Sequence, residues 1–259
     1  MKKAPSAEII AIGNELLIGH TLDTNSHWIA QRLTKYGWTL QRITTIRDSL
    51  IAIKTAVNEA LQRRPGLLIT LGGLGPTHDD MTVQGVALAL GKRLSVNDDA
   101  LAMIKARYQR LEAWTGLTSS RSKMATLPAG AEALPNPVGT APGVLIKVDR
   151  TKMVSLPGVP AEMKAIFNGS IIPLLKVSDH VAPSEAFLDL VGIVESALAP
   201  ALDKTRKAFP GLYFKSHPRG HESGIRSLIQ LHIYSVDPGA RSRLDNAISF
   251  LLRELSKSP

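Results

Sequence analysis

Apolar residues along this chain form short continuous runs that alternate with helical stripes. The runs at residues 8–13 and 67–71 are apolar at nearly every position and are closed by glycine. This pattern predicts strands that are covered on both faces, as in a parallel sheet. A further strand is predicted at 38–46, and helical spacing is found at 25–36, 49–61, 83–90 and 101–111. Strands that alternate with helices predict crossover units and therefore an α/β layer fold.

The pattern changes in the middle of the chain and restarts near 176–183. Residues 127–143 are rich in Pro, Gly and Ala and predict long ordered loops, which lead into strands at 144–148 and 152–156. After the restart, a small α+β domain is predicted from the order strand, helix, strand, strand, helix. Its elements are expected at 187–191, 196–209, 212–216, 227–234 and 240–255. We therefore predict two domains, 6–176 and 184–259.

Composition limits the class of protein. The 259 residues are 44% hydrophobic and 20% charged and include no cysteine, which excludes disulfides and thiolate metal sites. No stretch approaches the length of an apolar membrane span, and no signal-like apolar run follows the N-terminus. We expect a cytoplasmic protein that makes no membrane contact. The net charge of +9 is scattered along the chain, which favours a solvated basic surface over a nucleic-acid site.

The glycine-rich segment after the run at 67–71 is the strongest candidate for a binding loop. It contains Gly72, Gly73, Leu74, Gly75, Thr77 and Thr82, and a predicted helix follows it. Glycines at such a junction bring backbone N–H groups close to a ligand, and a helix N-terminus favours phosphate. The segment matches neither a Walker loop nor a dinucleotide fingerprint.

Carboxylates follow several of the predicted strands. Asp79 and Asp80 allow two interpretations: they cap and precede the next helix, or they hold Mg²⁺ against ligand phosphates. Glu15 and Asp48 are either local capping residues or members of the same cluster, because parallel strands gather binding groups at their carboxyl ends. Asn25 serves equally as a helix cap or as a hydrogen-bonding partner of a ligand.

Two more loops combine rigid and small residues. The first contains Asn136, Gly139 and Thr140, and the second contains Pro157, Gly158 and Glu162. Each alone is explained by turn formation. Three such loops in one domain favour a shared pocket for a phosphorylated small molecule.

Six motifs in order resemble the N-terminal domain of the CinA (competence/damage-inducible) family, which belongs to the molybdopterin-binding superfamily. They lie within 8–19, 23–25, 47–48, 72–82, 139–143 and 156–163, and the resemblance extends over about 6–176. It implies a three-layer α/β/α fold with a mixed, mainly parallel sheet. Residues 192–196 are similar to the small KH-like domain that follows in CinA proteins.

The resemblance also implies an activity. CinA N-terminal domains are associated with an ADP-ribose pyrophosphatase that requires a divalent cation, Mg²⁺ or Co²⁺. Asp80 matches the functional aspartate of the superfamily, and Asp79, Asp48 and Glu15 match CinA carboxylates. We predict Asp48, Asp79 and Asp80 as catalytic and the last two as metal ligands. The alternative is a molybdopterin-binding protein without pyrophosphatase activity.

Leu74 stands where the cofactor-biosynthesis members usually have threonine, which argues for a ligand other than pterin. Bacterial CinA continues into a nicotinamide mononucleotide deamidase domain, and this chain stops at Pro259, so deamidation is not expected. The predicted ligand-binding residues are Gly13, Glu15, Asn25, Gly72, Gly73, Leu74, Gly75, Thr77, Thr82, Asn136, Gly139, Thr140, Pro157, Gly158 and Glu162.

The tail is expected to pack or to form a homodimer. Every second residue of the predicted strand 227–234 is expected on its exposed side, namely Leu228, Gln230, His232 and Tyr234. These side chains do not identify the partner. A KH domain grips nucleic acid with a Gly-x-x-Gly loop between helices. Residues 217–224 form only a basic glycine loop between strands, so nucleic-acid binding is not expected.

Overall fold

The computed structural model describes residues 4–112, 115–175, 184–219, 228–235, 237 and 239–257. The chain forms two compact units, a larger one that ends by residue 175 of the described ranges and a smaller one that begins at residue 184. The boundary predicted at 176–183 lies outside the described residues.

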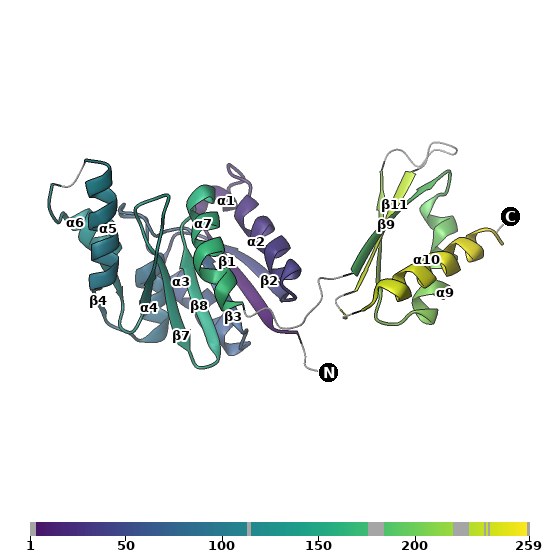
Figure 1. Ribbon diagram of the computed structural model, residues 1–259, viewed down its shortest axis with the longest axis horizontal. Coiled ribbons are helices and arrows are strands. Elements are labelled where there is room, and N and C mark those ends of the chain that lie inside the picture. The colour runs from purple at the N-terminus through teal and green to yellow at the C-terminus, as the bar shows by residue number, and fades with distance from the viewer. Residues whose placement is uncertain are drawn as a thin grey trace. The chain divides into compact units, whose positions relative to one another are not determined.

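A six-stranded sheet forms the centre of the larger unit (Figure 1). Its order is β2 (Thr39–Ile46), β1 (Ser6–Ile12), β3 (Leu67–Leu71), β8 (Thr151–Leu156), β7 (Gly143–Val148) and β6 (Glu132–Leu134). The first four strands are mutually parallel, whereas β7 is antiparallel to both β8 and β6. The predicted mixed, mainly parallel sheet is confirmed.

Helices cover both faces of this sheet. On one side lie α2 (Thr24–Lys35) and α7 (Pro160–Ile166), and on the other side lie α3 (Leu50–Gln62) and α4 (Thr82–Leu90) (Figure 1). The chain also forms α1 (Asn14–Leu17), α5 (Asp98–Arg110), α6 (Ser119–Ala125), η1 (Phe167–Ile171) and α8 (Ile172–Leu174). The alternation of strands and helices in the sequence thus produces crossover connections that cover the sheet.

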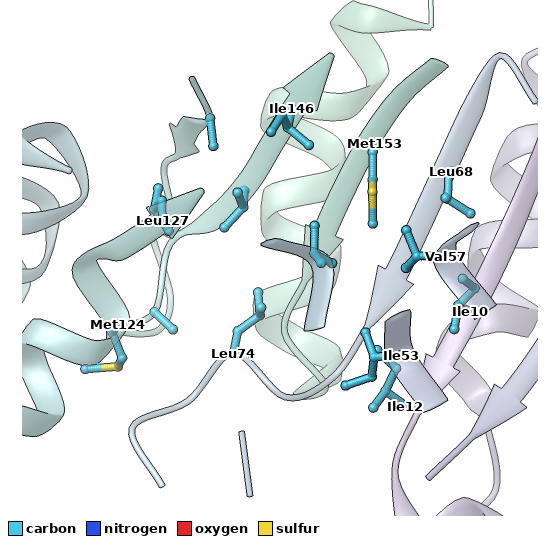
Figure 2. Close-up of a cluster of buried hydrophobic side chains, with 14 of the residues drawn as sticks. Ile10, Ile12, Ile53, Val57, Leu68, Leu74, Met124, Leu127, Ile146 and Met153 are labelled. Carbon is cyan, nitrogen blue, oxygen red and sulfur yellow. The ribbon is translucent and has the colours of Figure 1, made fainter. Parts of the chain in front are cut away.

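One apolar cluster joins the sheet to α3, α4 and α5 (Figure 2). Ile10 and Met153 come from strands, Ile53 and Val57 come from α3, and all four are at most 2% exposed. Leu74, from the glycine-rich loop, also points into this cluster. Burial of a leucine side chain contributes about 1.5–3 kcal/mol, so Leu74 fixes its loop to the core.

The prediction of long loops at 127–143 was wrong in part. β5 (Thr126–Pro128) pairs with β4 (Leu94–Val96), and β6 lies at the edge of the main sheet. α6, which precedes β5, begins after Thr118, whose side chain accepts a hydrogen bond from Arg121 N at 3.3 Å. Strands of three residues are too short to show alternation, and proline is tolerated at strand edges, so the sequence pattern resembled loop.

The smaller unit is an antiparallel sheet with two helices. It consists of β9 (Ser184–Val191), α9 (Glu195–Ala208), β10 (Tyr213–Pro218), β11 (Leu228–Ser235) and α10 (Arg241–Leu255), and the strand order is β10-β11-β9. Ile229, Leu231 and Ile233 of β11 are buried in one cluster with Leu198 of α9 and Leu244 of α10. Both helices therefore cover the same face. The observed element order is the predicted one, and the KH-like character stays a prediction.

No helix in the described ranges is long and apolar enough to span a membrane.

A first prediction concerns the contact between α3 and α4. A Cβ at Gly85 would lie 2.5 Å from Ile53 Cγ2, so Gly85→Ala is expected to lower the free energy of unfolding. Overpacking of this kind costs about 1–3 kcal/mol, which exceeds the helix propensity that alanine adds. The measurement is urea denaturation, with Gly169→Ala as the control, because no atom lies within 4 Å of a Cβ there. A loss at Gly85 no larger than at Gly169 would contradict the close contact.

Candidate binding pocket

A pocket of about 500 Å³ opens at the carboxyl ends of the four parallel strands. Gly13 follows β1, Asp48 follows β2, the segment 72–75 follows β3, and Gly158 follows β8; all of them line the pocket. The edge where such strands end is where open α/β sheets bind ligands. Its volume suits a molecule of nucleotide size.

The glycines of the central loop are required by geometry. Gly72 has a φ of +98°, and a Cβ there would lie 2.4 Å from the Ile12 carbonyl oxygen. Gly73 has a φ of +66°, and a Cβ there would lie 2.4 Å from Thr82 Oγ1. Side chains other than hydrogen would therefore be both strained and obstructed at these two positions.

Thr82 fastens this loop to the start of α4. Its hydroxyl donates to the Gly72 carbonyl at 2.7 Å, and its N–H donates to the Gly73 carbonyl at 3.1 Å. Thr82 is fully buried and does not line the pocket. It is thus a positioning residue rather than a direct ligand contact.

Three consecutive N–H groups in the loop have no partner. Those of Gly73, Leu74 and Gly75 donate no hydrogen bond to any residue that the structure describes. All three residues line the pocket. Successive unpaired N–H groups form a concavity that binds anions. The Leu74 side chain points into the core, so this residue offers the pocket its backbone.

The pocket is acidic. Its lining includes six carboxylates and no Lys or Arg: Glu15, Asp23, Asp48, Asp79, Asp80 and Glu162. Lys123 does not line the pocket but donates to the Thr77 carbonyl beside it. An anionic ligand here would have to be held by backbone N–H groups or accompanied by a cation.

Asp79 and Asp80 share one hydroxyl. Thr77 Oγ1 contacts Asp79 Oδ1 and lies 2.5 Å from Asp80 Oδ2, and Thr77 N donates to the same Asp80 oxygen at 2.9 Å. A hydroxyl has one proton to donate, so it satisfies one carboxylate at a time. The bond from Thr77, followed by that from its own backbone N–H, lowers the pKa of Asp79 below its ordinary value of 3.8.

Neither Asp79 nor Asp80 caps the helix that follows them. α4 begins at Thr82, its N-cap is Met81, and no side chain caps it. Asp48 does not cap the helix that follows it; its Oδ2 accepts from Asn14 N at 2.8 Å, 34 residues earlier in the chain, and fixes the start of α1. At α2 the capping oxygen belongs to Asp23, which accepts from Ser26 N at 2.9 Å.

Asn25, near the start of α2, binds the loop that follows β8. Its Nδ2 donates to the Gly158 carbonyl at 2.7 Å, and a Cβ at Gly158 would lie 3.5 Å from Gly72 Cα. The loops after β3 and β8 therefore meet at van der Waals distance. Asn25 Oδ1 is buried and has no hydrogen-bond partner in the described part of the chain, although the residue lines the pocket.

The loop after β6 supports the pocket from outside. Asn136 donates to Glu162 Oε2 at 2.7 Å and to the Ala141 carbonyl at 2.8 Å, and it accepts from Gly139 N at 2.8 Å. A Cβ at Gly139 would collide with the Glu162 carboxylate at 1.8 Å. Asn136 and Gly139 therefore position Glu162 and Thr140, both of which line the pocket.

Most predicted site residues meet at this pocket. Those that line it are Gly13, Glu15, Asn25, Asp48, Gly72, Gly73, Leu74, Gly75, Asp79, Asp80, Thr140, Pro157, Gly158 and Glu162. Thr77, Thr82, Asn136 and Gly139 lie behind it. The prediction omitted Leu16, Thr21, Leu22, Asp23 and Val159, which line it as well. An 81% exposed Leu22 gives no sequence signal, because exposure is decided by the fold.

The predicted metal pair is not part of a larger cluster. Within the described ranges, no three His, Asp or Glu side chains gather closely enough to hold a metal ion by themselves. Mg²⁺ commonly takes one or two carboxylates and completes its shell with phosphate oxygens and water. In the described ranges, Asp79 and Asp80 thus have no third His, Asp or Glu beside them to complete a metal site.

Comparison with known families agrees with this architecture. The sequence profile of the family described as "Probable molybdopterin binding domain" matches residues 8–177, which hold the whole pocket. The chain belongs to this family. A crystal structure of the protein CinA from Thermoplasma acidophilum is similar at a TM-score of 0.62 and 42% identity, and the match covers 66% of this chain and 98% of that one. The chain is thus a CinA-like member.

Relatives from archaea are similar to this chain over most of its length. A protein of Aeropyrum pernix is 42% identical over 261 residues, with 99% of this chain and 93% of the relative covered. A protein of Pyrococcus horikoshii is 44% identical over 228 residues, with 86% and 88% covered. The two units therefore occur together in these relatives.

A second prediction follows from the shared hydroxyl. Thr77→Val removes the main cause of the lowered Asp79 pKa, so that pKa is expected to rise towards 3.8. Because the folded-state pKa lies below the unfolded one, ionised Asp79 stabilises the fold above the unfolded pKa, and this is lost as pH falls through the folded pKa. A ¹³C NMR titration of the carboxyl groups measures the shift. Thr21→Val, in the same pocket, is the control, and an equal change there would contradict the assignment.

Proposed function

We propose that the larger unit binds a phosphorylated, molybdopterin-type ligand in the pocket at the carboxyl ends of its parallel strands. The observation that carries this proposal is the row of unpaired N–H groups at Gly73, Leu74 and Gly75. Oxygens of one phosphate would accept from them at the start of α4, where the helix dipole adds to the attraction. The family description supports the pterin part of the ligand.

The apolar wall of the pocket suits a flat ring. Leu22 and Val159 line it although they are 81% and 53% exposed, and Pro157 and Pro160 lie beside them. A heterocycle against these side chains would remove apolar surface from water, at about 25 cal/mol per Å². The unpaired Asn25 Oδ1 offers an acceptor to a ring or sugar donor.

A divalent cation would reduce the repulsion between a ligand phosphate and the carboxylates of the pocket. With six carboxylates around the pocket, a phosphate at the loop would meet repulsion from Asp79 and Asp80. Mg²⁺ between these carboxylates and the phosphate would supply the missing positive charge. Binding is therefore expected to be weaker when divalent cations are removed with a chelator.

A third prediction tests the binding proposal. The full chain is purified from a host that makes molybdopterin, and oxidative release of bound pterin is quantified by fluorescence. We expect pterin with the wild type and its loss in Gly73→Ala, whose Cβ would obstruct the loop. Gly169→Ala is the matched control, because a Cβ there would have no atom within 4 Å.

If the Gly73→Ala variant does not fold, the Asn25→Ala variant takes its place. Absence of pterin from the wild type, or equal pterin in the variants, would refute the proposal.

Hydrolysis of a nucleotide-sugar diphosphate is the second candidate. The observation that favours it is the pair of carboxylates on one Thr77 hydroxyl beside the phosphate loop. In such a reaction, water attacks one phosphorus of ADP-ribose, the bridging P–O bond breaks, and AMP and ribose 5-phosphate form. A cation at the pair would neutralise the diphosphate and orient the water.

A fourth prediction separates this activity from binding alone. If the second candidate holds, ADP-ribose with Mg²⁺ or Co²⁺ yields AMP, and Asp80→Asn lowers the rate by about 100-fold or more, as loss of an electrostatic contact at the reacting group does. Asp98→Asn, in the first turn of α5 and outside the pocket lining, should retain the rate. Chromatography of the products measures both. No turnover, or equal turnover in Asp80→Asn, would leave ligand binding as the function.

A further inference from the structure

In the smaller unit, one face of the sheet is covered by no helix that the structure describes. α9 and α10 lie on the same side of the sheet (Figure 1), and alternate residues of β11 are buried beneath them. The other face carries the alternate residues of all three strands, and Phe187 and Tyr213 on it are 56% and 50% exposed. We refer to it as the open face; it consists of Glu185, Phe187, Asp189, Val191, Tyr213, Lys215, His217, Leu228, Gln230, His232 and Tyr234.

Rings stand in a row across the open face. Phe187 and His232 are stacked with centroids 4.3 Å apart and planes 8° apart. Tyr234 lies 5.1 Å from His232, and Tyr213 lies 4.8 Å from Tyr234. Four rings from three strands thus form one continuous aromatic surface. Because they already contact each other, little side-chain entropy is lost when a flat ligand stacks on them.

Charge is divided between the two edges of this face. Lys215 and His217 lie on β10, and Lys215 is paired in register with His232. Arg219 follows the strand, and its Nη2 donates to Gln230 Oε1 at 2.8 Å. The acids lie on β9, where Asp189 accepts from Gln230 at 2.9 Å and Glu185 contacts His232 at 3.2 Å. Asp189, Glu185 and Arg219 are thus hydrogen-bonded within this face, whereas the side chain of Lys215 on β10 has no partner among the described residues and is available to an anion.

The area of the open face distinguishes between two candidate occupants, a second copy of this chain and a short row of stacked bases. Three strands of up to eight residues present a face of roughly 15 by 25 Å, or about 400 Å², which is half of the roughly 800 Å² per partner that a stable dimer needs. The same area accommodates about two or three stacked bases, as on other aromatic sheet faces.

From these observations we infer that the open face binds single-stranded nucleic acid. Bases stack on Phe187, His232, Tyr234 and Tyr213, and the phosphates run along Lys215 and Arg219. This surface is distinct from a Gly-x-x-Gly loop, on whose absence the expectation against nucleic acid was based. The inference concerns the smaller unit and does not rest on the ligand proposed for the larger one.

The test is fluorescence anisotropy with the full chain and labelled single-stranded oligouridylate at low salt. Wild type is expected to bind, with an affinity that falls as salt increases because phosphates release counterions. Phe187→Ala and Tyr213→Ala are each expected to weaken binding about fivefold or more, as loss of one stacking ring does. Phe187→Leu keeps the apolar volume but should weaken binding too, which a merely structural role would not predict.

Matched controls lie away from the open face. Lys215→Gln should weaken binding, whereas Lys207→Gln on α9 should not; likewise Leu252→Ala on α10 should leave the affinity unchanged. Absence of binding by the wild type, or equal loss in Lys207→Gln, would overturn the inference. So would sedimentation that shows a dimer in the wild type and a monomer in Phe187→Ala, because a second copy would then occupy the face.

Discussion

The binding pocket depends on the way one loop is held between a strand and a helix. Gly72 and Gly73 adopt backbone angles that favour glycine, Thr82 bonds to both of their carbonyls, and Leu74 is buried in the core. Each restraint acts on a different part of the loop, so together they leave it one conformation. In that conformation the N–H groups of Gly73, Leu74 and Gly75 make no hydrogen bond to any described residue, so an anion that accepted from them would meet a loop that is already ordered.

Charge then limits what the pocket can accept. A protein with a net charge of +9 surrounds its main pocket with six carboxylates, so its positive charge is placed elsewhere. An anion can enter this environment only with strong local donors or with a cation. Gly73, Leu74 and Gly75 offer unpaired backbone N–H groups as such donors, and we propose the Asp79–Asp80 pair as the place of such a cation. Whether the bound molecule is only held or also hydrolysed depends on how that cation and a water are arranged.

The smaller unit differs from the larger one in the side chains that it presents for binding. Its open face combines exposed rings such as Phe187 and Tyr213 with Lys215 on the edge strand β10. Relatives such as that of Aeropyrum pernix match over nearly the whole chain, so both units recur together. A pocket for a small phosphorylated ligand and a surface for a short single strand would give one chain two separate binding functions.

The sequence by itself indicated the longer strands and helices and most of the residues that line the pocket, and its family resemblance implied the mixed sheet. Continuous apolar runs such as 67–71 and glycines such as Gly72 reflect local constraints, namely burial on both faces and positive φ, that one segment displays on its own. Tertiary structure decided the rest. The roles of Leu74 as a core anchor, of Thr82 and Asn136 as positioning residues, and of Leu22 as a pocket wall depend on neighbours distant in the chain. The row of rings on the open face likewise arises from the register of three strands, which no single segment encodes.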